Sequence, residues 1–296
     1  KDDNTPPSVP YFRSIGAAPM ANRSDIPHLI DLLDGASHDV RELVLRELLS
    51  FGQSLEDELA AMDDQLSPAQ RRAAERIVAA HRQAEVRWDS WGEWPKLQDP
   101  NEQLEAAFEL LAQFQYGWAP PVSLRHMLDD LSRDYLTTCH TRDALSLSRY
   151  LFGVKNLRGN RDEYYAPLNS NLIHVIQSGT GLPISLACIF VLIGARCGVA
   201  IEGCCAPGHF LARARMGGRT VFFDCFDGGR MLTEKEIGTI RAQMPKRLWQ
   251  ALADAATPVD IVRRVLNNLI HAYDLEGDTS QAQLMRDLQG GLPILS

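Results

Sequence analysis

A change in hydrophobic period after residue 198 is the feature that most constrains the fold. Before it, an apolar run over 182–195 has Pro183 in its first turn, which predicts a buried helix that reaches Cys197 and stops at Gly198. After it, apolar and polar residues alternate, which is typical of half-buried strands. The predicted strands are Val199–Cys205, His209–Met216 and Thr220–Phe226.

Helical periodicity dominates the rest of the chain. The order is therefore helices, one long buried helix, a small antiparallel sheet, and helices again. This order predicts an α+β fold that is mainly helical, with the long helix packed on the sheet. The expected parts are a flexible lead-in over 1–22, a helical region over 23–95, the α+β domain over 96–245 and a C-terminal helical tail over 246–296.

The helical region over 23–95 contains a candidate repeat. The stretch IPHLIDLLDGASHDVRELVLRELLSFG resembles a HEAT repeat, a helical hairpin with a short turn. A looser copy follows, and the interval from Arg41 to Arg72 is about 31 residues, within the range of short helical repeats. An ordinary helical bundle is the alternative interpretation.

Three tryptophans close this region, at positions 88, 91 and 94. Their spacing would line one face of a helix, but Gly92 and Pro95 weaken a helix here. We therefore expect a linker over 88–95 whose aromatic side chains pack on the next domain. An aromatic patch that binds carbohydrate or peptide is the alternative.

The net charge and the cysteine content limit the classes of function that the chain can have. The formal net charge of −8 argues against a nucleic-acid partner, because phosphate binding needs a clustered positive surface. The apolar run over 182–195 is too short for a membrane span. Six cysteines without a CxxC pair predict reduced, mostly buried thiols and favour the cytoplasm, although a signal peptide before Lys1 is left open. No cofactor is expected, and a metal site of His209, Asp224 and a cysteine has no known ligand spacing behind it.

A hairpin turn at Gly217-Gly218 brings a histidine and a carboxylate to the same face of the predicted sheet. With a two-residue turn, Met216 faces Arg219, and His209 and Asp224 become diagonal neighbours. A carboxylate in that place orients an imidazole and stabilises its charge. A one-residue change of register would put the two on opposite faces. A buried histidine satisfied by an aspartate is the structural alternative.

Several blocks of the sequence carry a family resemblance. The blocks are Gly159-Asn160, Tyr164-Tyr165, Asn169-Ser170, Gly181 to Leu186, Pro207 to Phe210, and Asp224 with Phe226, Gly228 and Gly229. Together they resemble the SirB-type transglutaminase-like family, over roughly residues 100–245. That resemblance implies a transglutaminase- or papain-like core with a Cys-His-Asp triad, in which His209 and Asp224 match the second and third positions.

The first triad position departs from the family pattern. The resemblance aligns Pro183 with the nucleophile cysteine, and proline has no nucleophile. Ser185 is one replacement, since His209 would be its general base, and a helix-start hydroxyl bonded to the backbone is its alternative. Cys188 is a second replacement, with an inert core thiol as the alternative.

Two function classes follow. The first is a non-catalytic module that binds a protein or peptide partner. The second is a hydrolase or acyltransferase that acts on amide bonds through Ser185, His209 and Asp224. If the family fold holds, Tyr164, Tyr165, Asn169 and Ser170 flank the same pocket and bind substrate; anchoring of a loop through side-chain hydrogen bonds is the alternative.

Overall fold

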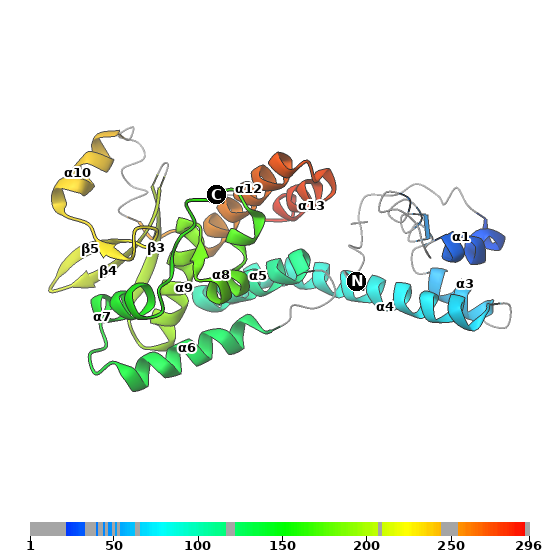
Figure 1. Ribbon diagram of the computed structural model, residues 1–296, viewed down its shortest axis with the longest axis horizontal. Helices are drawn as coiled ribbons and strands as arrows, with labels where there is room; N and C mark the ends of the chain where they lie inside the picture. Colours follow the sequence, from blue (N-terminus) through cyan, green and yellow to red (C-terminus); the bar gives the residue numbers. More distant parts are fainter. Residues whose placement is uncertain are drawn as a thin grey trace. The chain divides into compact units, whose positions relative to one another are not determined.

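The computed structural model divides the chain into two compact units (Figure 1). One unit comprises Lys1–Ser90 with Tyr116–Ala119, and the other comprises Trp91–Gln115 with Pro120–Ser296. The predicted lead-in, apart from Asn22, and most of the predicted helix between 39 and 51 lie outside the described residues. The structure describes residues 22–32, 40, 44, 47–48, 51, 54–62, 66–116, 122–206, 209–243 and 254–293.

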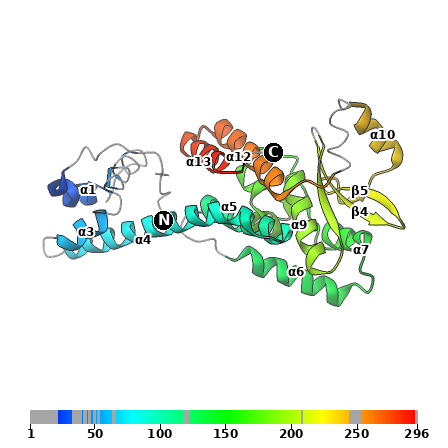
Figure 2. The ribbon, with the colours of Figure 1, turned by 180° about the vertical axis from the view of Figure 1, so that it is seen from behind.

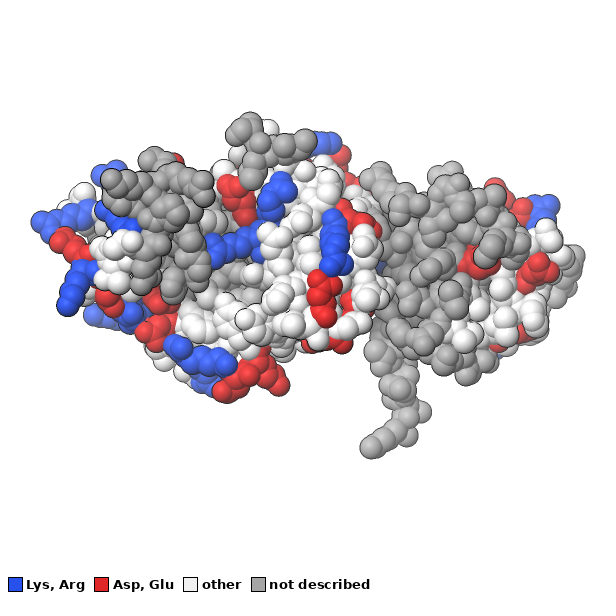
Figure 3. All heavy atoms as spheres, turned by 90° about the horizontal axis from the view of Figure 1, so that it is seen from above, with Lys and Arg blue, Asp and Glu red and all other residues white. Residues whose placement is uncertain are grey.

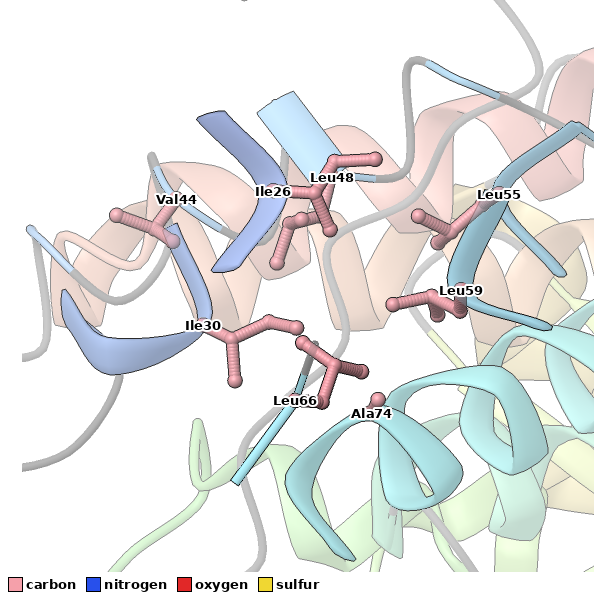
Figure 4. Close-up of a cluster of buried hydrophobic side chains, with 8 residues drawn as sticks. All are labelled: Ile26, Ile30, Val44, Leu48, Leu55, Leu59, Leu66 and Ala74. Atoms are coloured by element: carbon pink, nitrogen blue, oxygen red, sulfur yellow. The ribbon is translucent and has the colours of Figure 1, made fainter. Parts of the chain in front are cut away.

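The first unit is helical and has its own small core. Its elements are η1 (Arg23–Asp25), α1 (Ile26–Leu32), α3 (Ser54–Ala61) and α4 (Pro68–Glu93), the last of which continues into the second unit. Side chains from α1, α3 and α4 point toward one another in Figure 4, together with those at positions 44, 48 and 66, and form a buried aliphatic cluster. The cluster consists of Ile26, Ile30, Val44, Leu48, Leu55, Leu59, Leu66 and Ala74. The HEAT-like assignment stays a prediction.

The segment over 88–95 is helical and not the expected linker, because α4 continues to Glu93 and the 3₁₀ turn η3 (Trp94–Lys96) follows directly. The expected packing of its aromatic side chains on the next domain is confirmed for Trp91, whose ring contacts that of Phe114 at 6.0 Å between centroids. Trp91 and Trp94 are buried, so the aromatic-patch alternative is also wrong for these two rings. The indole Nε1 of Trp91 donates a hydrogen bond of 3.0 Å to the Leu288 carbonyl. Burying two indole rings outweighs the cost of about 1 kcal/mol for a helical glycine, which explains why Gly92 does not end the helix.

The second unit surrounds one buried helix with other helices. Helix α9 (Pro183–Arg196) is buried along nearly its whole length, and Gly198 follows it with a φ of 71°. The sequence prediction for this helix is confirmed. The other helices are α5 (Pro100–Tyr116), α6 (Leu124–Thr138), α7 (Ala144–Ser148), the π-helical turn η4 (Arg149–Val154), the 3₁₀ turn η5 (Pro167–Ser170), α8 (Leu172–Ser178), α10 (Glu234–Gln243), α12 (Pro258–Glu276) and α13 (Thr279–Gly290).

A four-stranded antiparallel sheet with the order β3-β4-β5-β6 packs against α9 (Figures 1 and 2). Met216 pairs with Arg219 across the Gly217-Gly218 turn, where both glycines have positive φ, so the predicted hairpin is confirmed. A separate parallel pair joins β1 to β2. The strands are β1 (Arg158–Gly159), β2 (Thr180–Gly181), β3 (Ile201–Ala206), β4 (His209–Met216), β5 (Arg219–Asp224) and β6 (Arg230–Met231).

The two faces of the sheet are covered by different helices. The rings of Phe190 on α9 and Phe223 on β5 lie 5.4 Å apart, edge to face. The neighbouring Phe222 points the other way and packs with Cys204, Leu211 and Ile237 of α10. The sheet is therefore covered on both sides around Phe222 and Phe223, and the α+β architecture predicted from the sequence is confirmed.

The last two helices pack onto this core. Helix α12 contacts η5, and the Ala256 amide donates to the Gly203 carbonyl on the outer edge of β3 at 2.8 Å. The Thr257 hydroxyl and the Asp260 carboxylate form a capping box that begins α12. Because β3 is bonded on this edge, the segment before α12 continues the hydrogen bonding of the sheet.

Cysteines and surface charge agree with the expectations from composition. All six cysteines are free thiols, and four of them are buried, so the prediction of reduced, mostly buried thiols is confirmed. Within the described ranges, no helix combines the length and the apolar character that a membrane crossing requires. On the face shown in Figure 3, described Lys and Arg side chains lie among Asp and Glu side chains.

Candidate functional site

The family blocks that lie far apart in sequence meet beside the start of α9. The β1–β2 pairing places Gly159 opposite Gly181, and the Asn160 amide donates to the Gly181 carbonyl at 3.1 Å. The Gly159 amide donates to the Phe226 carbonyl at 3.1 Å. A Cβ atom at 159 would overlap the Phe226 ring, so this approach requires glycine.

Asn169 holds this assembly together from the inside. Its Nδ2 donates to the carbonyls of Glu163 at 2.6 Å and Tyr164 at 3.1 Å, and its Oδ1 accepts from Asn160 Nδ2 at 3.0 Å. Its side chain is buried, with 1% of the residue exposed. The side chain therefore fixes the 160–169 loop, which is the anchoring alternative offered by the sequence.

The start of α9 is connected to the same asparagine. Leu182 is the N-cap and offers no side-chain cap, and Pro183 occupies the first turn. Ser185 is completely buried, and its Oγ donates to the Asn169 carbonyl at 2.8 Å. The Leu182 amide donates to the same carbonyl at 3.3 Å. The hydroxyl predicted as a nucleophile is therefore engaged with the backbone and closed off from solvent.

The other predicted replacement for the nucleophile, Cys188, is also enclosed. It is completely buried in α9, and this burial raises the pKa of its thiol well above the ordinary value. Thiolate is the nucleophilic form of cysteine, so a raised pKa disfavours reactivity at neutral pH. The inert-thiol interpretation fits this environment.

Asp224 begins a tight turn after β5. Its Oδ1 accepts hydrogen bonds from the amides of Phe226 and Asp227, each at 3.1 Å. Ser148 of α7 donates to the Gly229 carbonyl at 2.6 Å and fastens the far end of the turn. The carboxylate thus shapes the turn that carries Phe226.

His209 is the first residue of β4, and its backbone pairs with Ala206. The register between β4 and β5 is the one predicted from the sequence, with Ala212 opposite Phe223. The side chain of His209 lies outside the part of the structure that is described. A His209–Asp224 pair therefore stays a prediction.

Two tyrosines lie at the surface of the loop that Asn169 anchors. Tyr164 is 39% exposed and Tyr165 is 56% exposed. The Tyr164 ring contacts Phe226 at 5.8 Å and Tyr165 at 5.2 Å between centroids, and burial of its inner side raises the pKa of its phenol. Tyr165 contacts the His271 ring of α12 at 5.2 Å.

The predicted site residues thus fall into two groups. Asn169, Ser170 and Ser185 are buried, whereas Tyr164 and Tyr165 are exposed. His271 was not anticipated, because it lies about a hundred residues away on an amphipathic helix and belongs to no motif. Among the residues that the structure describes, no group of three or more His, Cys, Asp or Glu side chains is arranged to hold a metal ion.

Comparison with known proteins accounts for this convergence of blocks. Residues 122–267 match the model of the transglutaminase-like superfamily. The chain contains a transglutaminase-like domain. The narrower SirB-type assignment stays a prediction, and no solved structure matches the chain.

The transglutaminase-like domain has relatives in bacteria and mammals. A UPF0162 protein of Xylella fastidiosa is 36% identical over 136 residues, which cover 43% of this chain and 48% of the relative. F-box only protein 21 of Homo sapiens is 30% identical over 150 residues, covering 48% of this chain and 23% of that protein. A UPF0162 protein of Pseudomonas aeruginosa is 28% identical over 199 residues, covering 65% and 72%. The match thus spans about half of the Xylella protein and about a quarter of the human one.

Proposed function

We propose that the transglutaminase-like domain is a non-catalytic module that binds a protein or peptide partner. The observation that carries this proposal is the environment of Ser185, whose hydroxyl is buried and donates to the Asn169 carbonyl. A serine nucleophile needs its oxygen beside a general base and open to substrate. The bonded and enclosed hydroxyl supports a structural role instead.

The alignment of the helix start adds support. By resemblance, Pro183 occupies the position of the nucleophile cysteine, and it lies in the first turn of α9. The nearest thiol in that helix, Cys188, is completely buried. A domain that keeps the fold but lacks the nucleophilic thiol is expected to bind a partner without catalysing a reaction.

The relatives are consistent with a module used in different settings. Stretches of 136 and 150 residues of this chain match about half of a bacterial UPF0162 protein and about a quarter of human F-box only protein 21. Similarity to parts of longer chains is typical of a portable domain. A fold alone does not establish an activity, so the proposal rests on the site.

Turnover assays with the full chain test the proposal that the domain is non-catalytic. The substrates are casein with a fluorescent primary amine, for acyl transfer, and p-nitrophenyl acetate, for hydrolysis. We expect rates equal to buffer for the wild-type chain and for His209→Ala. A rate above buffer that His209→Ala abolishes, in a variant with an unchanged unfolding midpoint, would overturn the proposal.

A hydrolase or acyltransferase acting on amide bonds is the second candidate. The hairpin register supports a pairing of His209 with Asp224, because it gives the two residues the same parity. Asp224 also shares the parity of Phe222, which points away from α9, so the register does not by itself bring the pair to Ser185. In this mechanism Ser185 Oγ attacks the acyl carbonyl while His209 accepts the hydroxyl proton. His209 then returns this proton to the amine that leaves, and water or another amine releases the acyl group.

Covalent labelling separates the two candidates. A fluorophosphonate probe is incubated with the chain, and labelled peptides are identified by mass spectrometry. Ser132 is a matched control, because it is also buried and its Oγ also donates to a backbone carbonyl, that of Leu128, at 2.7 Å. Labelling lost in Ser185→Ala but kept in Ser132→Ala supports the enzyme, and no labelling of Ser185 supports the module.

A further inference from the structure

An array of aromatic rings runs outward from the Asp224 turn to the surface. Phe226 contacts Tyr164, Tyr164 contacts Tyr165, and Tyr165 contacts His271, each edge to face. The inner ring, Phe226, is half-buried, whereas Tyr165 and His271 are exposed. Exposed tyrosines held in fixed positions are typical anchors of protein interfaces, since few rotamers are lost on binding.

Two carboxylates precede the tyrosines in the same loop. Asp162 and Glu163 are exposed. Within the described part of the chain, neither side chain forms an ion pair or a hydrogen bond. We call Asp162, Glu163, Tyr164, Tyr165 and His271 the tyrosine surface. It combines exposed ring faces with negative charge that nothing described neutralises.

The same loop contains an internal example of what such a surface binds. The guanidinium of Arg161 lies over the Phe226 ring at 5.0 Å from the centroid. Its Nη2 also forms an ion pair of 3.2 Å with Asp227 Oδ1. One cation is thus held by a ring face and a carboxylate together, which is a favourable combination for arginine.

We propose that the tyrosine surface docks a basic polypeptide segment of a partner protein, whose Lys or Arg side chains stack on Tyr165 and pair with Asp162 and Glu163. This inference rests on the proposed binding function and names the chemistry of the partner. The net charge of −8 attracts such a segment over a longer range. The ring stacking and the local carboxylates then fix where it binds.

The positive groups near the surface are compatible with this occupant. Arg161 is paired with Asp227. Arg264 on α12 lies over the Phe210 ring at 5.7 Å, and its charge also acts on the Tyr164 phenol. The outer edge of the loop, at Asp162 and Glu163, keeps its negative character.

Binding to the full chain is measured by fluorescence anisotropy. The probe is a labelled twelve-residue peptide that repeats Gly-Arg-Ser-Lys, and the comparison peptide has Glu in place of each Arg and Lys. We expect the basic peptide to bind and the acidic one not to bind at the same concentrations. Equal binding of the two peptides would overturn the inference.

Matched variants separate local docking from general attraction. Asp162→Asn/Glu163→Gln removes two negative charges from the tyrosine surface. Asp89→Asn/Glu102→Gln removes two exposed negative charges elsewhere and leaves the same net charge. We expect the first variant to weaken binding about fivefold and the second to change it less than about twofold. Equal weakening by the two variants would show that only net charge acts, and would reject the site.

The ring contribution has its own test. Tyr165→Leu keeps an apolar side chain but removes the ring face, and we expect about threefold weaker peptide binding. Tyr165→Phe keeps the ring and should bind within about twofold of the wild type. Wild-type binding by Tyr165→Leu would contradict the inference.

These results are independent of the turnover assays. Catalysis that depends on His209 would overturn the binding function, whatever the peptide does. Absence of both catalysis and selective peptide binding would overturn the tyrosine surface and leave the proposed module standing.

Discussion

Two parts of the same loop reverse the usual division between inside and outside. Asn169 is polar and 1% exposed, whereas Tyr165 is aromatic and 56% exposed. Buried polar groups are kept where their hydrogen bonds are satisfied, as those of Asn169 are. The difference teaches that stability and recognition are carried by different residues of one motif, so substitutions should separate the two.

Asn169→Ala should have the largest effect on stability. It removes the side-chain donor to the carbonyls of Glu163 and Tyr164, of which only Glu163 keeps a second described donor, the Ala166 amide, and it removes the partner of Asn160. We expect the free energy of unfolding to fall by about 2–4 kcal/mol, measured by urea denaturation. Asn101→Ala, whose side chain forms no described hydrogen bond, is the control and should cost less than about 0.5 kcal/mol. A similar loss in both variants would contradict the anchoring role.

Gly159→Ala should come next. The added methyl group would overlap the Phe226 ring and force the Asp224 turn away from β1. Overpacking of this kind costs about 1–3 kcal/mol, and urea denaturation measures it. Gly153→Ala is the matched control, because nothing lies within 4 Å of a Cβ atom at that position. If Gly159→Ala is no more destabilising than its control, the contact with Phe226 is not a close one in solution.

Ser185→Ala should cost less. The variant removes one hydrogen bond, but the Leu182 amide still donates to the Asn169 carbonyl. We expect a loss of about 1 kcal/mol in the free energy of unfolding. Ser185→Cys introduces a thiol at this position, and the buried environment predicts that the thiol stays unreactive toward iodoacetamide in the folded state. Rapid alkylation of that cysteine would show that the helix start is open to solvent.

Tyr165→Leu should have the smallest effect on stability. It therefore gives the clearest contrast with Asn169→Ala. The side chain is exposed, and exposed substitutions usually change the free energy of unfolding by less than about 0.5 kcal/mol. The same variant is the one expected to weaken peptide binding. A loss of stability comparable to that of Asn169→Ala would mean that the tyrosine is an anchor of the fold.

Local signals in the sequence are sufficient to predict the elements whose structure is set by nearby residues in the chain. The apolar run over 182–195 and the stop at Gly198 define α9, and Gly217-Gly218 defines the β4–β5 hairpin. Both depend on periodicity and on turn chemistry, which a short window of sequence contains.

Contacts between distant segments could not be derived in the same way. The pairing of β1 with β2 joins two-residue strands, and no periodicity exists in so short a stretch. Trp91 and Trp94 looked like part of a linker because Gly92 and Pro95 suggest a break, but burial in the second unit outweighs this local preference. The sequence leaves two roles open for Asn169, substrate binding and loop anchoring. Only the tertiary structure shows to which carbonyls its side chain donates hydrogen bonds.

The hydrogen bond between Trp91 and Leu288 has a consequence for the synthesis of this protein. It joins residues that are 197 positions apart, so the donor leaves the ribosome long before the acceptor exists. Domains of this kind complete their packing only when their last element is available. Until α13 has emerged, the indole of Trp91 lacks its native cover, and the nascent second unit exposes an aromatic surface that chaperones recognise.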